Sequence, residues 1–421
     1  MSAKITATEP LPADYLKEIE TAFKQTLKDL YNGKQPTNKM LVETGKALAN
    51  RAVESYGAVQ ANFTTPDAVM LSKLVNNCWQ FSAAKNHKEL RDLSAAMVDN
   101  DGKLREWNDF KEAAQTINEK FNQTWMRTEY DQAIAGATSA ARWADFEKDA
   151  DTIPNLQYQT VGDSFVRPEH QILNGVTRPL KDEFWNTHYP PNGWGCRCEA
   201  LQVPDGFGAV TPDEKVPRIN IAPMFRTNLA KTGVIFPKEH PYFNGIKEFP
   251  EELSRALLNL PPENSYTSLV IGDSEIDIHL LHGERELGKN LNAVNALLQH
   301  DKEAKIKLLP IIQEKDKKLK KKYLSENYLK KFPDKNPDLL YNKKVAEIEV
   351  PNGSKRSIQH AVEHGIKQAE FIIIHLPEDA DFDSAVRVVN GQMKHYQDNN
   401  SEIWLVNNKE KRIYKSISDK E

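Results

Sequence analysis

Cysteine, long apolar runs and net charge are all scarce in this chain of 421 residues. Its three cysteines are too few for a disulfide scaffold and indicate a reducing compartment. No segment stays apolar for the roughly 18 residues that a membrane-spanning helix needs, so no membrane partner is expected. The formal charge of −4 excludes a general attraction to nucleic acid. The start, MSAKITATEPLPADYL, lacks a basic segment followed by an apolar core, so no signal peptide is predicted.

The composition is that of a soluble globular protein, with 39% hydrophobic and 28% charged residues. From about Pro10 to Arg142, apolar residues recur every three or four positions, which predicts packed helices. Turn-rich and aromatic sequence follows as far as Leu201, and prolines are then frequent up to Pro262. We therefore expect an α+β protein of two domains, a mainly helical domain with a small turn-rich sheet and a C-terminal α/β sheet domain. The predicted ranges are 1–205, a proline-rich connecting segment at 206–264, and 265–421.

The densest group of unusual residues is Phe184–Cys198, FWNTHYPPNGWGCRC. Two tryptophans, a Pro-Pro pair, two glycines and Cys-x-Cys indicate a loop of fixed shape. Together with Arg167, His170 and Gly175 upstream, the order V-R-x-x-H, Gly, F-W, P-P-N-G-W-G, C-R-C resembles the phage Mu F-like family of head morphogenesis, or minor head, proteins. The resemblance implies a structural role in a phage head, with portal or capsid proteins as partners. It also implies residence in the bacterial cytoplasm and in the virion.

His170, Cys196 and Cys198 are residue types that bind zinc. A fourth ligand is not obvious, although Cys78, His188 and Asp163 are candidates. A packed loop with buried thiols explains the same residues. We favour this second interpretation because a zinc site of this kind ordinarily has a second cysteine pair.

Strands and helices alternate in the last part of the chain, which predicts a sheet with helices on its faces. The hairpin is expected to turn at Asn342–Lys343, and Ser354 is expected to cap a helix. The other expected elements are strands within Ser268–Gly283, a helix at Glu284–Gln299, and strands at Lys305–Ile312, Asp338–Tyr341, Val345–Val350, Phe371–Leu376, Glu402–Asn408 and Arg412–Ile417.

Acidic residues gather on the predicted hairpin. Asp338 follows a proline at the start of one strand, and Glu347 and Glu349 share a face of the next because side chains alternate. Carboxylates in this arrangement bind Mg²⁺, which activates water for phosphodiester hydrolysis. The pattern resembles PD-(D/E)xK with Glu349 in place of the lysine, so Lys355 or Arg356 would have to supply the cation. An acidic strand edge facing solvent is the alternative.

The order of motifs from about residue 265 to 416 resembles the C-terminal tRNA nuclease domain of contact-dependent growth inhibition proteins, the CdiA toxins. The resemblance implies a ribonuclease that acts on tRNA, and hence an immunity protein as a partner. Its matching positions are Glu286, Asn290, Leu308–Pro310, Pro337–Asp338, Glu347, Ser354–Ser357 and Lys367–Gln368.

A metal-free ribonuclease mechanism is also open, with a base, a cation and the ribose 2′-OH as nucleophile. His360, His364, Lys355 and Ser357 are the candidates for it. Phosphate is expected to bind where cations meet the free N–H groups of a helix N-terminus. The residues expected to bind substrate are Ser354, Arg356, Ser357, His360 and Gln368. An inactive domain that binds nucleic acid and a purely structural virion protein are the competing hypotheses.

Overall fold

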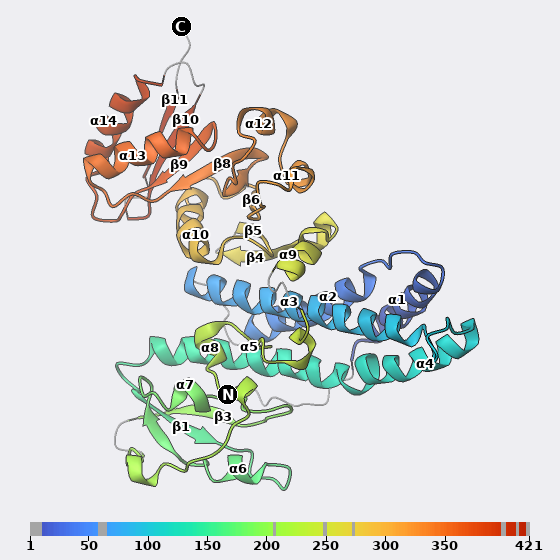
Figure 1. The fold of residues 1–421 in the computed structure, drawn as a ribbon. Helices are drawn as coiled ribbons and strands as arrows, with labels where there is room; N and C mark the ends of the chain where they lie inside the picture. Colours follow the sequence, from blue (N-terminus) through green and yellow to red (C-terminus); the bar gives the residue numbers. More distant parts are fainter. Residues whose placement is uncertain are drawn as a thin grey trace. The chain divides into compact units, whose positions relative to one another are not determined.

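The structure is a computed structural model in which the chain forms two compact units, Met1–Ala61 with Met70–Leu260, and Asn62–Val69 with Pro261–Glu421 (Figure 1). The predicted boundary between residues 205 and 206 lies outside the described residues. The described residues are 11–57, 65–204, 208–246, 251–271, 274–396, 401–409 and 412–417.

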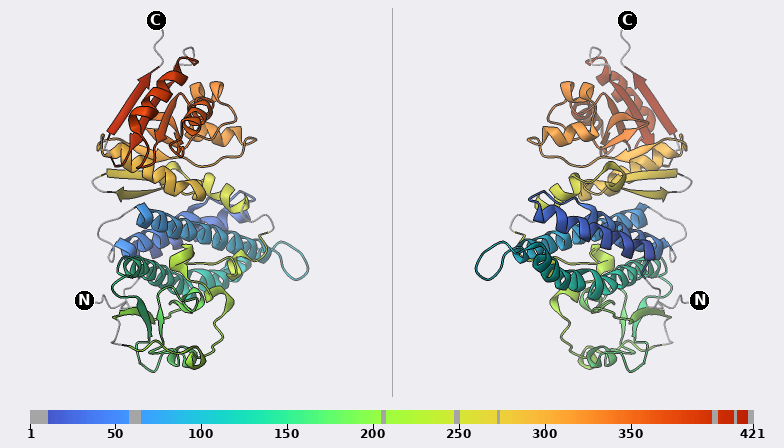
Figure 2. Two further views of the ribbon diagram at one scale, coloured as in Figure 1. Left: turned by 90° about the vertical axis from the view of Figure 1, so that its left-hand side faces the viewer. Right: turned by 90° about the vertical axis from the view of Figure 1, so that its right-hand side faces the viewer.

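Long helices dominate the first unit, as the apolar periodicity predicted, and run alongside one another in both views of Figure 2. In the first helix Tyr15, Ile19, Phe23 and Leu27 recur every four residues and are all buried, so this helix contributes one apolar stripe to the core. The principal helices of the unit are α1 (Ala13–Tyr31), α2 (Lys39–Gly57), α3 (Thr65–Ala96), α4 (Trp107–Glu119) and α5 (Met126–Lys148).

A three-stranded antiparallel sheet follows, with β1 between its two neighbours. The proline-rich stretch beyond it packs against the helices of the same unit. Phe236 stacks on Phe81 with ring centroids 3.9 Å apart, and its backbone exchanges two hydrogen bonds with Asn77. The elements of this region are β1 (Asn155–Gln159), α6 (Pro168–Gln171), β2 (Thr177–Pro179), α7 (Trp185–His188), β3 (Glu199–Val203), α8 (Leu229–Thr232) and α9 (Glu251–Leu258).

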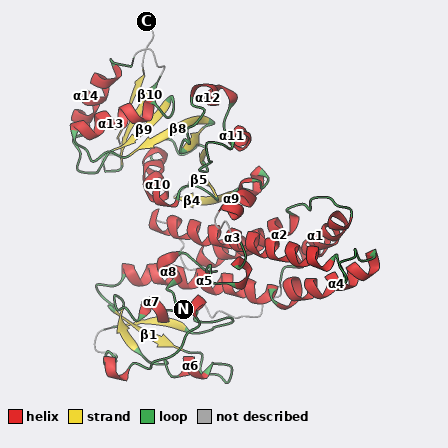
Figure 3. Ribbon diagram, viewed as in Figure 1, coloured by secondary structure: helices red, strands yellow, loops and turns green. Residues whose placement is uncertain are grey.

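The second unit is built on an eight-stranded mixed sheet, drawn yellow in Figure 3, in the order β11-β10-β9-β8-β7-β6-β5-β4. Neighbours pair antiparallel except β5–β6, β8–β9 and β9–β10, which are parallel. The strands are β4 (Tyr266–Ile271), β5 (Ser274–His279), β6 (Ile306–Leu308), β7 (Leu339–Tyr341), β8 (Lys344–Glu349), β9 (Phe371–His375), β10 (Glu402–Asn407) and β11 (Arg412–Ile417).

Helices cover this sheet, and a core cluster of the unit lies between α13, α14 and the strands β9 and β10. Ser354 caps α13 as predicted, because its Oγ accepts a hydrogen bond from the N–H of Ser357. The helices are α10 (Glu284–Leu298), α11 (Lys317–Tyr323), α12 (Glu326–Lys331), α13 (Lys355–Ile366) and α14 (Phe382–Met393).

The predicted hairpin is confirmed, with Asn342 and Lys343 both at positive φ, as a tight two-residue turn requires. The strand expected at Lys305–Ile312 is wrong in length, since β6 ends at Leu308. Pro310 cannot donate to a ladder, and Ile311 donates its N–H to the carbonyl of Leu281 instead.

The chain therefore forms a mainly helical first part, which is followed by a sheet-rich C-terminal part. None of the helices in the described ranges combines the length and the apolar character needed to cross a lipid bilayer.

Candidate functional site

The three acids predicted to bind metal lie together on the β7–β8 hairpin. Leu339 pairs with Ala346, so the next residues outward, Asp338 and Glu347, face each other across the two strands. Glu349 lies two positions beyond Glu347 and hence on the same face of the sheet. The hairpin register thus places the three carboxyl groups near one another on one face, although among the described residues only Glu347 and Glu349 of the three belong to the group of ligand atoms within 4.8 Å of one another.

Asp338 is held by a chain of hydrogen bonds. Its Oδ2 accepts from the N–H of Ile348 at 2.8 Å, and its Oδ1 accepts from Nδ2 of Asn290 at 2.9 Å. Nδ2 of Asn290 also lies 3.1 Å from Nε2 of His282, whose Nδ1 donates to the carbonyl of Leu309 at 2.7 Å. Burial lowers the pKa of His282, so a neutral ring that donates at Nδ1 fits this chain.

Burial and mutual repulsion raise the pKa values of these acids. Burial raises the pKa of Asp338 to about 6. Burial, followed by the charges of Asp338, Glu349 and Glu286, raises the pKa of Glu347 to about 10. Oε2 of Glu347 is buried and has no hydrogen-bond partner among the described residues. A buried oxygen of this kind is a polar group for which the protein alone provides no partner.

His364 completes the cluster from α13. Its Nδ1 lies 2.5 Å from Oε1 of Glu349, and its Nε2 lies 3.3 Å from the amide nitrogen of Gln368. The ring of His360 lies parallel to it at 6.2 Å. Ligand atoms of Glu347, Glu349 and His364 all lie within 4.8 Å of one another. The arrangement offers oxygen and nitrogen ligands for a cation.

The other predicted residues lie at the start of α13. The Ser354 and Ser357 hydroxyls accept hydrogen bonds from backbone N–H groups there, the latter from Asn352. Lys355 begins the helix, whereas His364 comes nine residues later, about 13 Å further along its axis. Burial raises the pKa of Glu349, and the nearby His364 and His360 of α13 offset part of this rise. Lys355 and Arg356 are exposed at this end of the helix.

Some residues of the cluster were not given a role from the sequence. Glu286 and Asn290, one turn apart on α10 and named above only as matching positions of the toxin resemblance, act on Asp338 through charge and a hydrogen bond. Their i, i+4 spacing places both on one helix face. The hydroxyl of Tyr328 donates to the carbonyl of Gln368 at 2.7 Å and lies close enough for Glu347 to raise its pKa. No spacing in the sequence indicates this last neighbour.

A second cluster lies in the first unit, where His170 of α6 meets Cys196 and Cys198 just before β3. Both sulfur atoms lie 3.7 Å from Nδ1 of His170, and all three residues are buried. A hydrogen bond from Cys198 is the main cause that lowers the pKa of Cys196. This thiolate and the imidazole are soft ligands of the kind that bind zinc.

None of the three expected fourth ligands joins this cluster within the described parts of the chain. The Asp163 carboxylate accepts two hydrogen bonds of 2.7 Å from the guanidinium of Arg197. Nδ1 of His188 lies 3.2 Å from the carbonyl of Phe184, and Cys78 is buried in α3.

The loop that carries the cysteines is held from two sides. Nη2 of Arg167 donates to the carbonyl of Trp194 at 2.5 Å. The hydroxyl of Tyr158 donates to Oδ1 of Asn192 at 3.1 Å. Gly195 lies at a φ of 64°, which favours glycine because it has no side chain to clash. The unusual residues of the motif thus fix one loop conformation, as the composition predicted.

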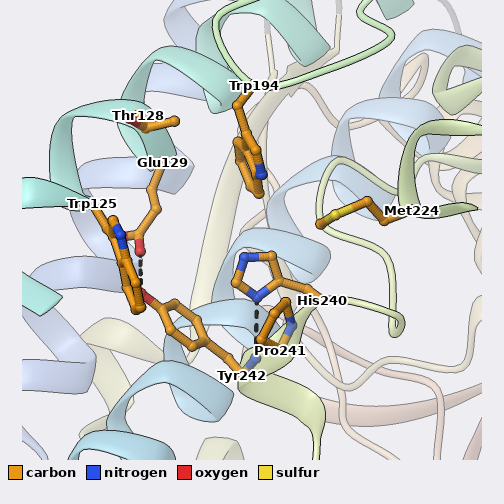
Figure 4. Close-up of a pocket in the computed structure, with 8 residues that line it drawn as sticks. All are labelled: Trp125, Thr128, Glu129, Trp194, Met224, His240, Pro241 and Tyr242. Atoms are coloured by element: carbon orange, nitrogen blue, oxygen red, sulfur yellow. Dashed lines mark hydrogen bonds between the residues drawn. The ribbon is translucent and has the colours of Figure 1, made fainter. Parts of the chain in front are cut away.

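Trp194 also lines a pocket of about 430 Å³ within the first unit (Figure 4). Its acid, Glu129, is already engaged, because it accepts 2.6 Å hydrogen bonds from the hydroxyl of Tyr242 and from Nζ of Lys85. Because its acid is engaged in these bonds, the pocket presents mainly aromatic and apolar side chains. Its lining residues are Trp125, Thr128, Glu129, Trp194, Met224, His240, Pro241 and Tyr242.

Comparison with known proteins bears on the first unit. The putative capsid assembly protein F of Escherichia phage Mu is 44% identical over 73 residues, which cover 17% of each chain. The Mu-like prophage FluMu F protein of Haemophilus influenzae is 45% identical over 67 residues, 15% of this chain and 16% of that protein. The alignments thus span about a sixth of each relative. No solved structure matches significantly. Residues 104–201, which contain the predicted motifs, match the family described as Phage Mu protein F like protein.

Proposed function

We propose that the chain is a phage head assembly protein whose second unit is a metal-dependent nuclease that cleaves RNA. The observation that carries the nuclease is the buried carboxyl cluster, in which Oε2 of Glu347 has no partner among the described residues. Hard oxygen ligands are those that Mg²⁺ prefers, so the residues fit this ion. Asp338, Glu347 and Glu349 would hold it. When bound, the ion would favour ionised water and offset charge on the phosphate.

The chain's own side chains have distinct tasks in this proposal. Asn290 orients Asp338 through the bond to its Oδ1. His364 contacts Glu349, the residue that stands where the PD-(D/E)xK pattern has its lysine, and would act there as the base or the cation. Arg356 and Lys355 at the start of α13 would attract the RNA backbone. The preference for tRNA rests on the order of motifs shared with the growth-inhibition toxins, and an active ribonuclease would need an immunity protein in the cell.

Incubation of the intact chain with total tRNA, in Mg²⁺ or in EDTA, tests the nuclease. We expect cleavage only with Mg²⁺ and a loss of at least about a hundredfold in Glu347→Gln, because an essential group of the metal site is removed. Glu363→Gln is the matched control, since Glu363 is an exposed acid of α13 that pairs with Lys367. Equal activity of the two variants, or cleavage in EDTA, would contradict the proposal. Binding of tRNA without cleavage by the wild type would favour the inactive alternative.

The head-assembly role is supported by the Mu F-like segment and is separable from cleavage. It places the chain in the bacterial cytoplasm during assembly and then in the virion, with portal or capsid proteins as partners. We expect the chain to co-sediment with phage heads assembled in its host. Glu347→Gln should be incorporated normally, whereas Trp194→Ala, which alters the motif loop and its pocket, should be depleted. Wild-type chain that never enters heads would argue against this half of the proposal.

A further inference from the structure

We propose that His170, Cys196 and Cys198 bind a zinc ion that fastens α6 to the start of β3. The proposal is independent of the nuclease, because it concerns the first unit alone. Its foundation is the convergence of two sulfur atoms on a single imidazole nitrogen, at 3.7 Å each.

These distances fit a metal better than they fit packed thiols. Zn–S and Zn–N bonds of about 2.3 and 2.0 Å at tetrahedral angles separate sulfur from nitrogen by about 3.5 Å. Without a metal, Nδ1 of a neutral His170 has one lone pair and can accept from one thiol only. The second sulfur, at the same distance, then has no bonding role towards the ring. Cys198 also donates to Cys196, and a cation between the three atoms would bind both sulfurs and the nitrogen at these same separations.

The surroundings of Cys196 suit a thiolate ligand. Backbone N–H groups of Asn192 and Cys198 donate to its sulfur, which stabilises negative charge on it. The hydrogen bond to Cys196 and burial raise the pKa of the Cys198 thiol, and the guanidinium of Arg167 offsets part of this rise. Thiolate and imidazole together select zinc over magnesium or calcium. A water molecule would take the fourth position, because the Tyr158 hydroxyl donates to Asn192 and burial raises its pKa.

Burial indicates a structural role for the ion rather than a catalytic one. His170 is 3% exposed, Cys196 8% and Cys198 7%, which leaves little access for a substrate. The ion would join a one-turn helix to a strand end, in a region built mostly of turns. Such a cross-link stabilises the folded loop because the ligands are not assembled in the unfolded chain.

Zinc content of the full-length chain, measured by mass spectrometry after dialysis, tests the proposal. We expect about one zinc ion per chain, and less than a tenth of that in Cys196→Ser and Cys198→Ser. Cys78→Ala, which removes a buried thiol elsewhere, and Glu347→Gln, which alters the other cluster, should keep the ion. Zinc retained by Cys198→Ser, or a folded wild type that binds none, would overturn the proposal.

Cobalt replacement keeps the test valid if the serine variants fail to fold. Co²⁺ added to the wild-type chain should give an intense thiolate-to-cobalt absorption band in the near ultraviolet, which carboxylate ligands cannot produce. Absence of the band would overturn the zinc site even if metal binds elsewhere. Loss of tRNA cleavage would leave this result unaffected, so the two proposals fail separately.

Discussion

Buried carboxyl groups in the two units differ in the partners that the fold gives them. Oε1 of Glu89 accepts a hydrogen bond of 2.6 Å from Asn122, and the charge of Lys85 offsets part of its burial. Glu347 has acids as neighbours, and its Oε2 has no partner among the described residues. Accordingly the pKa rises to about 7 for Glu89 and to about 10 for Glu347. The first arrangement fits a structural group, and the second fits the cation ligand proposed above.

Glu89→Gln should remove a pH dependence of stability. The folded chain holds a proton on Glu89 up to about pH 7, whereas the unfolded chain loses it near 4.5. Stability from this group is therefore full below about pH 4.5 and falls as pH rises to about 7, by roughly 3 kcal/mol. Denaturant unfolding of wild type and variant at pH 5 to 8 measures the difference. Parallel profiles would contradict the assignment, and the exposed Glu20→Gln provides the control.

Sequence alone could predict the carboxyl cluster in part. The register of a tight hairpin places Asp338 opposite Glu347, and strand alternation adds Glu349. The contact of His364 with Glu349 depends on how α13 lies on the sheet, which no local spacing fixes. Lys320 shows the same limit of prediction from sequence. It belongs to the lysine-rich helix α11, and a run of lysines is expected to face solvent. Its Nζ is instead buried and donates to the carbonyls of residues 333 and 335.

Packing of α13 on β9 requires a glycine at 365. A Cβ there would lie 2.6 Å from Cγ2 of Ile372, well inside the limit for real contacts. Elements such as α13, β8 and β9 could be predicted, because the spacing of apolar residues and the helix cap are signals that lie within each element. This close approach could not, because it depends on the distance between two elements far apart in the chain.

Gly365→Ala should therefore destabilise the second unit by about 1–3 kcal/mol, because α13 must move off the sheet. Gly391→Ala is the matched control in α14, where nothing lies within 4 Å of an added Cβ. That control should be neutral or stabilising by up to about 1 kcal/mol, since alanine favours the helix. Chemical denaturation followed by circular dichroism compares them. Equal changes in the free energy of unfolding for the two substitutions would show that the contact with Ile372 does not limit stability.

At the scale of the whole molecule, each unit has a core of its own. Phe23, Phe110 and Leu93 lie in one cluster of the first unit, and Val362 and Ile403 lie in the main cluster of the second. The change in composition near residue 265 predicted a separate C-terminal domain. Residues 65–69, at the start of α3, group with the second unit although they lie far from it in the chain, and no composition signal indicates this.

Calorimetry should resolve two unfolding transitions that respond to different substitutions. Gly365→Ala should lower one midpoint, and Gly45→Ala should lower the other, because a Cβ at Gly45 would meet the Trp79 ring at 2.3 Å. A shift of about 2–4 °C per kcal/mol is expected for units of this size. A single transition that both substitutions lower together would mean that the units unfold as one.

The nuclease proposal depends on a cation at Asp338, Glu347 and Glu349, and calorimetric titration of the intact chain with Mn²⁺ measures this binding directly. Mn²⁺ takes the same carboxylate ligands as Mg²⁺. We predict a saturable site that weakens at least about tenfold in Glu347→Gln and is unchanged in Glu363→Gln. Binding that is absent from the wild type, or equal in all three chains, would contradict the account.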